Sequence, residues 1–177
     1  LHGLIWRKDI DNLIQKYAKW SAYEPEIKGV LIAYSSVYGN TQSAAEIVAN
    51  RLGEQGVKNI QMYDVSVTHP SYVVAEAFRY SHIVFATTTY NGGIFVTMEN
   101  LLLDLKAHNL QNRTVALIEN GTWAATAAGQ MKNILSSMKG MNVIANPVTL
   151  KSSVKPEKRD ELIALADAIC ETLKKRY

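Results

Sequence analysis

Cysteine is almost absent: the 177 residues contain only Cys170. A single cysteine excludes a disulfide within the chain, so we expect a reducing, cytoplasmic setting and a buried, structural role for this residue. No apolar run is long enough to cross a bilayer and no signal peptide is visible, so we expect no membrane partner. The net charge of +3 is small and the basic residues are dispersed, which argues against a nucleic-acid partner.

Clustered metal ligands are missing as well. Three of the histidines, His69, His82 and His108, are scattered along the chain, and no run of histidines and carboxylates has the spacing of a metal site. We therefore expect no metal bound by this chain alone.

What the chain does have is an ordinary globular composition, with 47% hydrophobic and 20% charged residues. From residue 29 onward, short apolar runs typical of buried strands alternate with amphipathic helical patterns. The predicted strands are 30–34, 60–63, 82–87, 114–118 and 143–145, the last extended by 147–151. The predicted helices are 41–55, 71–80, 96–107, 125–138 and 156–175.

The first 28 residues form a separate segment. Residues 1–7 look extended, and Asp9 is expected to cap a helix that carries apolar residues from Ile10 to Trp20 at helical spacing. Residues 23–26 then end this helix and act as a short linker.

Five strands that are each followed by a helix predict an α/β fold. The expected architecture is a doubly wound, five-stranded parallel sheet of order 2-1-3-4-5, with right-handed crossovers and helices on both faces. In that arrangement a ligand binds in the crevice at the carboxyl ends of strands 1, 3 and 4.

The loop after the first strand predicts a phosphate site. Its residues are Ser35, Ser36, Val37, Tyr38, Gly39, Asn40 and Thr41. A helix begins directly after this loop, so backbone N–H groups and the positive end of the helix dipole converge there. Hydroxyl and amide side chains add donors, while lysine and arginine are absent from the turn.

Two further loops carry the residues expected to hold a flat, phosphorylated cofactor. After the third strand come Thr88, Thr89, Tyr90, Asn91, Gly92 and Gly93, and after the fourth come Asn120, Gly121, Thr122 and Trp123. The hydroxyl and amide groups suit a polar chain and ring edges, and the glycine pair permits close backbone approach and positive φ angles. Trp123 offers a large aromatic face for stacking on a planar ring.

Taken together, these loops resemble those of flavodoxin-like FMN domains. Residues 35–41 are similar to the phosphate loop of that family, and residues 89–93 and 120–123 are similar to its two isoalloxazine loops. The resemblance covers essentially the whole chain and implies that FMN is the cofactor, bound by the loop residues named above. Ala124 and Ala125 depart from the family, in which glycines often surround the aromatic residue.

Residues 2–7 resemble the junction of flavodiiron proteins, in which a β-lactamase-like diiron domain precedes the flavodoxin domain. In that family the histidine matching His2 is the last ligand of the diiron centre. The resemblance implies that residues 1–28 are the junction and linker helix of an N-terminal diiron domain outside this sequence. Residues 29–177 then form the FMN-binding domain.

The resemblance also implies a function. The domain would take electrons from a rubredoxin-like or reductase donor and pass them to a diiron site that reduces O2 or NO, either in its own chain or in the other subunit of a head-to-tail homodimer. The domain alone would be an electron-transfer module without catalytic residues.

Two other functions stay open at this stage. An FMN-dependent quinone reductase would share the fold and cofactor but take hydride from NAD(P)H. A phospho-acceptor signalling domain would share the sheet order, but it needs carboxylates where Ser35, Ser36, Thr87 and Thr88 stand. Lys151 is the one residue near the position that such a domain requires.

Overall fold

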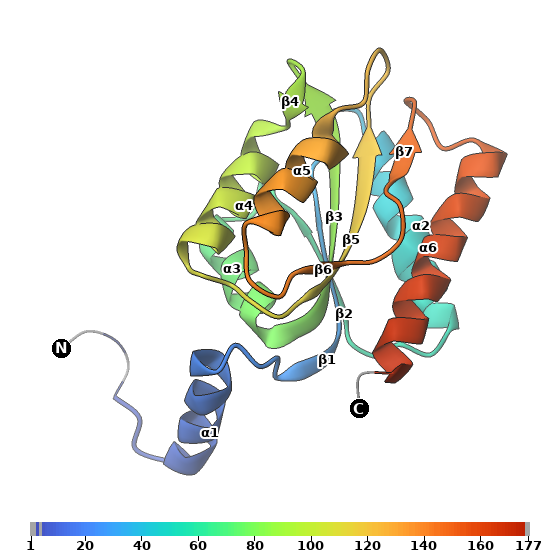
Figure 1. The fold of residues 1–177 in the computed structure, drawn as a ribbon. Helices are drawn as coiled ribbons and strands as arrows, with labels where there is room; N and C mark the ends of the chain where they lie inside the picture. Colours follow the sequence, from blue (N-terminus) through green and yellow to red (C-terminus); the bar gives the residue numbers. More distant parts are fainter. Residues whose placement is uncertain (1–2, 4, 176–177) are drawn as a thin grey trace.

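The computed structural model describes residue 3 and residues 5–175, so His2, the residue matching a diiron ligand, lies outside the described part. A central sheet is covered by helices on both faces (Figure 1). The strands are β1 (Ile27–Tyr34), β2 (Ile60–Asp64), β3 (Tyr80–Tyr90), β4 (Gly93–Ile94), β5 (Thr114–Asn120), β6 (Asn142–Val143) and β7 (Val148–Leu150). The helices are α1 (Ile10–Ser21), α2 (Asn40–Glu54), α3 (Pro70–Arg79), α4 (Val96–Ala107), α5 (Ala127–Ser136) and α6 (Pro156–Lys175).

The sheet confirms the predicted α/β topology. Its order is β2-β1-β3-β5-β6, with parallel pairing between these neighbours, and β7 also pairs with β5. The fifth predicted strand is split into β6 and β7. Ala145, between them, has φ 59°, in the left-handed region, so the chain cannot run extended through this point.

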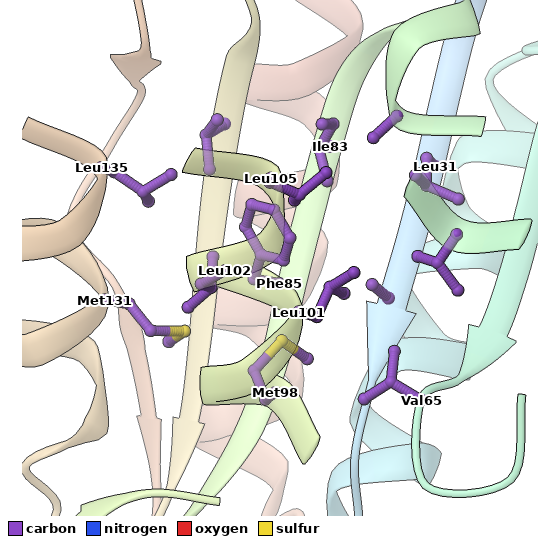
Figure 2. Packing of buried hydrophobic residues seen from close by; sticks show 14 of the residues in the cluster. Leu31, Val65, Ile83, Phe85, Met98, Leu101, Leu102, Leu105, Met131 and Leu135 are labelled. Atoms are coloured by element: carbon purple, nitrogen blue, oxygen red, sulfur yellow. The ribbon is translucent and has the colours of Figure 1, made fainter. Parts of the chain in front are cut away.

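Each face of the sheet has its own apolar cluster, which explains why the central strands read as apolar throughout. Val30, Leu31, Ile32 and Ala33 in β1 are fully buried, with alternate residues in the two clusters. In Figure 2, Phe85 of β3 lies against Leu101, Leu102 and Leu105 of α4. The other cluster joins the sheet to α2 and α6.

Cys170 belongs to the cluster under α2 and α6, as expected for a structural cysteine. Burial raises the pKa of its thiol. None of the helices in residues 5–175 has the length and apolar character that a bilayer-spanning segment needs.

The prediction of a loop after the third strand is wrong in part: most of this segment is a β-hairpin. β3 continues to Tyr90 and pairs antiparallel with β4, so that Thr89 faces Ile94 and Tyr90 faces Gly93. Asn91 and Gly92 form the turn with φ 49° and 73°. Positive φ at both central residues matches the strand twist, and Asn-Gly is the preferred pair for such a turn.

The N-terminal helix α1 extends from the amino-end edge of the sheet (Figure 1). It starts after Asp9 as expected, but the carboxylate of Asp9 caps no backbone N–H; it accepts a hydrogen bond from Asn12 Nδ2 at 2.9 Å. Asp9 has φ 54°, a left-handed conformation rather than the extended one of an ordinary N-cap. No residue of α1 is buried.

Candidate cofactor-binding site

The loops at the carboxyl ends of β1, β3 and β5 line an open cavity of about 420 Å³. This volume falls within the range of small-molecule sites, roughly 300–1,000 Å³. Its lining residues are Ser36, Val37, Tyr38, Asn40, Thr41, Thr88, Thr89, Tyr90, Asn91, Gly92, Asn120, Gly121, Thr122, Trp123, Ala124 and Ser152. The fold thus brings the three sequence-predicted loops to one place, and of the predicted residues only Ser35, Gly39 and Gly93 are not in the lining.

The first loop forms a cradle of backbone N–H groups at the start of α2. Its shape depends on Gly39, which has φ 83°, and on Ser36 Oγ, which accepts the N–H of Thr41 at 3.2 Å. Within the described residues, the N–H groups of residues 36–40 donate to no acceptor. Free N–H groups at a helix N-terminus are the donor set that a phosphate needs, so the loop fits the phosphate end of FMN.

Ser35 lies below this cradle rather than in it. The side chain is fully buried, and its Oγ is 2.7 Å from Thr87 Oγ1. The two hydroxyl groups therefore tie the end of β1 to β3 beneath the cavity floor.

The hairpin wall is held by its threonine side chains. Thr88 Oγ1 donates to the Asn120 carbonyl at 3.2 Å, which joins β3 to the end of β5. Thr89 Oγ1 accepts the N–H groups of Thr126 and Ala127, at 3.1 and 3.3 Å. Gly93 pairs with Tyr90 as the first residue of β4.

The third loop is closely packed at its start. A side chain at Gly121 would place a Cβ 2.9 Å from the Cα of Ala125, so only glycine fits there. Asn120 is buried, and its side-chain amide makes two hydrogen bonds of 2.9 Å with the backbone N–H and carbonyl of Ser152.

Ser152 and Ala124 line the cavity, although the sequence did not predict them. Ser152 follows β7, and its Oγ accepts from Asn40 Nδ2 at 3.4 Å. The position of Ser152 directly after the last predicted strand could have indicated it, because that strand also ends at the carboxyl edge of the sheet.

Aromatic side chains at the cavity are unusually exposed. Trp123 is 98% exposed and Tyr38 is 89% exposed. Tyr90 is half-exposed, with its ring edge-on to Phe95 at a centroid distance of 5.7 Å. Aromatic surface left open around a concavity marks a place where a ligand or partner completes the packing, and a planar ring system matches it.

The charges near the cavity are few. Its lining contains no lysine or arginine. Glu119 is buried behind it, with one carboxyl oxygen accepting the N–H of Ala128 at 2.7 Å and the other accepting from Thr149 Oγ1 at 2.8 Å. At the end of β1, burial raises the pKa of the Tyr34 phenol, and the nearby Asp64 and Glu46 carboxylates raise it further, so the phenol stays neutral.

Two other features bear on the alternatives. No group of three or more histidine, cysteine, aspartate or glutamate side chains within the described residues is placed to hold a metal ion. A larger hollow of about 540 Å³, lined mainly by apolar side chains, lies between α4 and the β2–α3 connection, and it contains none of the predicted site residues.

Comparison with known proteins agrees with this geometry. The sequence profile of the family described as flavodoxin matches residues 32–174. The chain belongs to the flavodoxin family. FMN binding, expected from the resemblance of the loops, follows from this membership.

Relatives and solved structures point to flavodiiron proteins within that fold. The chain is 27% identical over 146 residues to a nitric oxide reductase of Moorella thermoacetica, covering 82% of this chain and 36% of that protein. It is 22% identical over 158 residues to an anaerobic nitric oxide reductase flavorubredoxin of Aeromonas hydrophila, covering 88% and 31%. The chain thus spans about a third of the length of these curated relatives.

Among solved structures, the rubredoxin oxygen:oxidoreductase of Desulfovibrio gigas superposes with a TM-score of 0.86 at 22% identity, covering 93% of this chain and 40% of that one. An archaeal flavodoxin superposes with a TM-score of 0.71 at 20% identity, covering 82% and 99%. These structures confirm the flavodoxin-like fold and the resemblance to flavodiiron proteins.

Proposed function

We propose that this chain is the FMN-binding electron-transfer domain of a flavodiiron oxidoreductase that reduces O2 or NO. The observation that carries the proposal is one cavity in which an uncharged N–H cradle faces exposed aromatic side chains. When bound, FMN supplies the redox chemistry and exchanges electrons one at a time. The protein provides binding, orientation and the electrostatic surroundings.

Each wall has a role in this proposal. The N–H groups of residues 36–40 and the hydroxyls of Ser36 and Thr41 would hold the phosphate. Tyr90, Trp123, Gly121 and the Asn91–Gly92 turn line the cavity and would hold the ring. Thr88, Thr89 and Asn120 hold these walls in position through the hydrogen bonds described above.

The absence of cationic side chains from the lining sets the electrostatics. A phosphate held only by neutral donors keeps part of its negative charge uncompensated, and in a partly desolvated site that charge disfavours further negative charge on the ring. The site therefore favours a low potential for full reduction, which suits a domain that passes electrons onward.

The position of α1 supports a two-domain arrangement. Helix α1 precedes β1 at the amino-end edge of the sheet (Figure 1). The cavity is lined by the loops at the carboxyl-end edge. The 11 residues of β3 span about 36 Å between these edges. Apolar side chains on α1, including Ile10, Ile14 and Tyr17, are exposed and offer a contact surface for a preceding domain.

A preceding domain attached through α1 would lie at the end of this domain remote from its own FMN. The diiron site that receives the electrons then belongs to a second copy of the full-length chain, which makes the functional unit a homodimer. A rubredoxin-like protein is the proposed electron donor. We place the protein in the cytoplasm, where a buried, unpaired Cys170 stays reduced.

Three additions test the proposal: FMN to the protein, and then reduced rubredoxin or NAD(P)H to the FMN-loaded protein. Incubation with FMN should yield a yellow, 1:1 complex, and reduced rubredoxin should bleach its visible absorption within seconds. NAD(P)H alone should leave the absorption unchanged over the same time. Rapid bleaching by NAD(P)H would instead assign the chain to the quinone reductases, and a protein that stays colourless would end the FMN proposal altogether.

A further inference from the structure

The carbonyl oxygen of Gly92, in the hairpin turn of the cofactor site, is held by two side chains of the neighbouring helix region. Thr126 Oγ1 donates to it at 2.9 Å and Gln130 Nε2 donates to it at 2.7 Å. Neither residue lines the cavity. They are four positions apart, so both lie on the same side of the first turn of α5 and reach the same oxygen.

The hydroxyl of Thr126 is available for this bond because other groups cap α5. Thr126 stands at the N-cap position, yet its side chain makes no capping hydrogen bond. Thr89 Oγ1 accepts the N–H groups of Thr126 and Ala127, and the Glu119 carboxyl accepts that of Ala128. Side chains from β3 and β5 therefore hold the start of α5, and side chains of the α5 region hold the Asn91–Gly92 turn.

The turn needs such support. Asn91 and Gly92 both have left-handed φ angles, and Asn91 carries a side chain in that region. Both residues are exposed, so no burial of the turn itself holds this conformation. Asn-Gly is the preferred pair for such a turn, so the local sequence favours these φ angles, and the two bonds to Gly92 add the contacts that fix the turn against α5.

We propose that Thr126 and Gln130 are positioning residues, which hold the Asn91–Gly92 turn in its cofactor-binding conformation before FMN arrives. The proposal rests on the proposed function in one respect, that the turn belongs to the FMN site. Because the two bonds to Gly92 order the turn in the empty protein, FMN does not have to order it on binding, and its affinity is higher for that reason.

Amide hydrogen exchange of the FMN-free protein tests the turn directly, without using the cofactor. In the double variant Thr126→Val with Gln130→Leu, exchange at residues 90–94 should be faster by about tenfold, since two exposed hydrogen bonds of ordinary strength are lost. The dissociation constant for FMN should rise by a similar factor, and the two one-electron potentials should shift.

The controls separate positioning from general damage. Gln130→Lys keeps an N–H donor and should stay within about threefold of the wild type in exchange and in FMN affinity. Asn133→Ala, at an exposed position of the same helix, should change neither. If the double variant destabilises the whole domain, Gln130→Leu alone should show half of the effect on a logarithmic scale.

Unchanged exchange at residues 90–94 in a folded double variant would overturn the proposal, whether or not FMN binds. Faster exchange with unchanged FMN affinity would also overturn it, because the turn would then not need to be held for binding. If exchange is faster in the double variant but the wild-type protein binds no FMN, the proposed function is refuted and the structural part of the proposal stands.

Discussion

The two ends of the central sheet treat their polar groups in opposite ways. At the amino end, the fully buried guanidinium of Arg113 donates to the carbonyls of Ala77, Phe78, Tyr23 and Gln111 at 2.7–3.0 Å. At the carboxyl end, the N–H groups of residues 36–40 have no acceptor within the described chain, and Trp123 is 98% exposed.

We call the amino end of the sheet, with Arg113, the holding end, and the carboxyl end, with the cavity, the binding end. Arg113 fastens the linker at Tyr23 to the last turn of α3, and nearby Glu26 accepts a hydrogen bond from Trp20 Nε1 and lies 3.9 Å from Arg79. These contacts satisfy charged groups within the domain itself. Donors and aromatic surface left open at the other end contribute little to the fold, and they are available to a ligand.

The largest expected effect comes from breaking the holding end. Arg113→Met should lower the free energy of unfolding by about 3–5 kcal/mol, because several buried carbonyls lose their donor and the buried site loses its charge-assisted hydrogen bonds. Urea denaturation followed by circular dichroism measures this change. The exposed Arg159→Met on α6 is the control and should cost less than about 0.5 kcal/mol.

FMN binding by the folded Arg113→Met protein tests whether the two ends of the sheet are independent. FMN affinity under native conditions should stay within about twofold of the wild type, since Arg113 lies at the far edge of the sheet from the cavity. A large loss of FMN affinity in folded protein would mean that the two ends are not independent.

Breaking the binding end should have the reverse pattern. Trp123→Ala should weaken FMN binding by roughly tenfold to a hundredfold, because a stacked aromatic contributes about 1–3 kcal/mol once desolvated. The free energy of unfolding without FMN should change little, as the side chain packs on almost nothing. FMN fluorescence quenching gives the affinity, and Tyr72→Ala, an exposed aromatic on α3, is the matched control.

Gly39→Ala tests the phosphate cradle with a smaller expected effect. At φ 83° an alanine costs about 1–2 kcal/mol, and the change is conformational because nothing lies within 4 Å of the added Cβ. FMN affinity should fall several-fold as the cradle relaxes. Gly53→Ala, inside helix α2 at an ordinary φ, should instead stabilise the domain by up to about 1 kcal/mol and leave FMN binding unchanged.

The smallest effect is expected from a surface ion pair that belongs to neither end. The Asp167 carboxylate accepts two hydrogen bonds from Arg51, at 2.8 and 3.0 Å, and these bonds hold the pKa of Asp167 below its ordinary value. A lowered pKa in the folded state means that the contribution to stability is present at neutral pH and is lost as the pH falls through that pKa.

Asp167→Asn should therefore lower the urea midpoint slightly at pH 7, and the difference from wild type should shrink below about pH 4. A difference that grows on acidification would contradict a lowered pKa of Asp167 in the folded protein.

The sequence predicted the helices better than the strand ends. Helices 96–107 and 156–175 match α4 and α6 at both ends, because Pro156 and the apolar periodicity mark them locally. β3 runs three residues beyond its predicted end, since Thr88 pairs with β5, Thr89 and Tyr90 pair with β4, and pairing is a tertiary event. The capping of α5 by Thr89 and Glu119 was likewise unpredictable, because it joins segments 9–38 residues apart.

The sequence predicted the loops of the candidate site, but it did not show which residues of each loop line the cavity and which support it from behind. Repeated hydroxyls, amides and glycines after strands 1, 3 and 4 predicted the edge of the sheet at which these loops line one cavity in the structure. Sequence could not separate Ser36, which lines the cavity, from Ser35, which is buried against Thr87, because neighbouring positions of a tight turn differ only in direction. Ser152 enters the lining through its contacts with Asn120.

The most direct test of the account is an NMR titration of the 15N-labelled protein with FMN. We predict 1:1 binding, with the largest amide shifts in residues 36–41, 88–92, 120–124 and 152, and the strongest at the N–H groups of the phosphate cradle. Shifts concentrated instead around the larger apolar hollow between α4 and the β2–α3 connection, at Val65, Val73 and Leu103, would contradict the assignment of the cofactor to the carboxyl-end cavity.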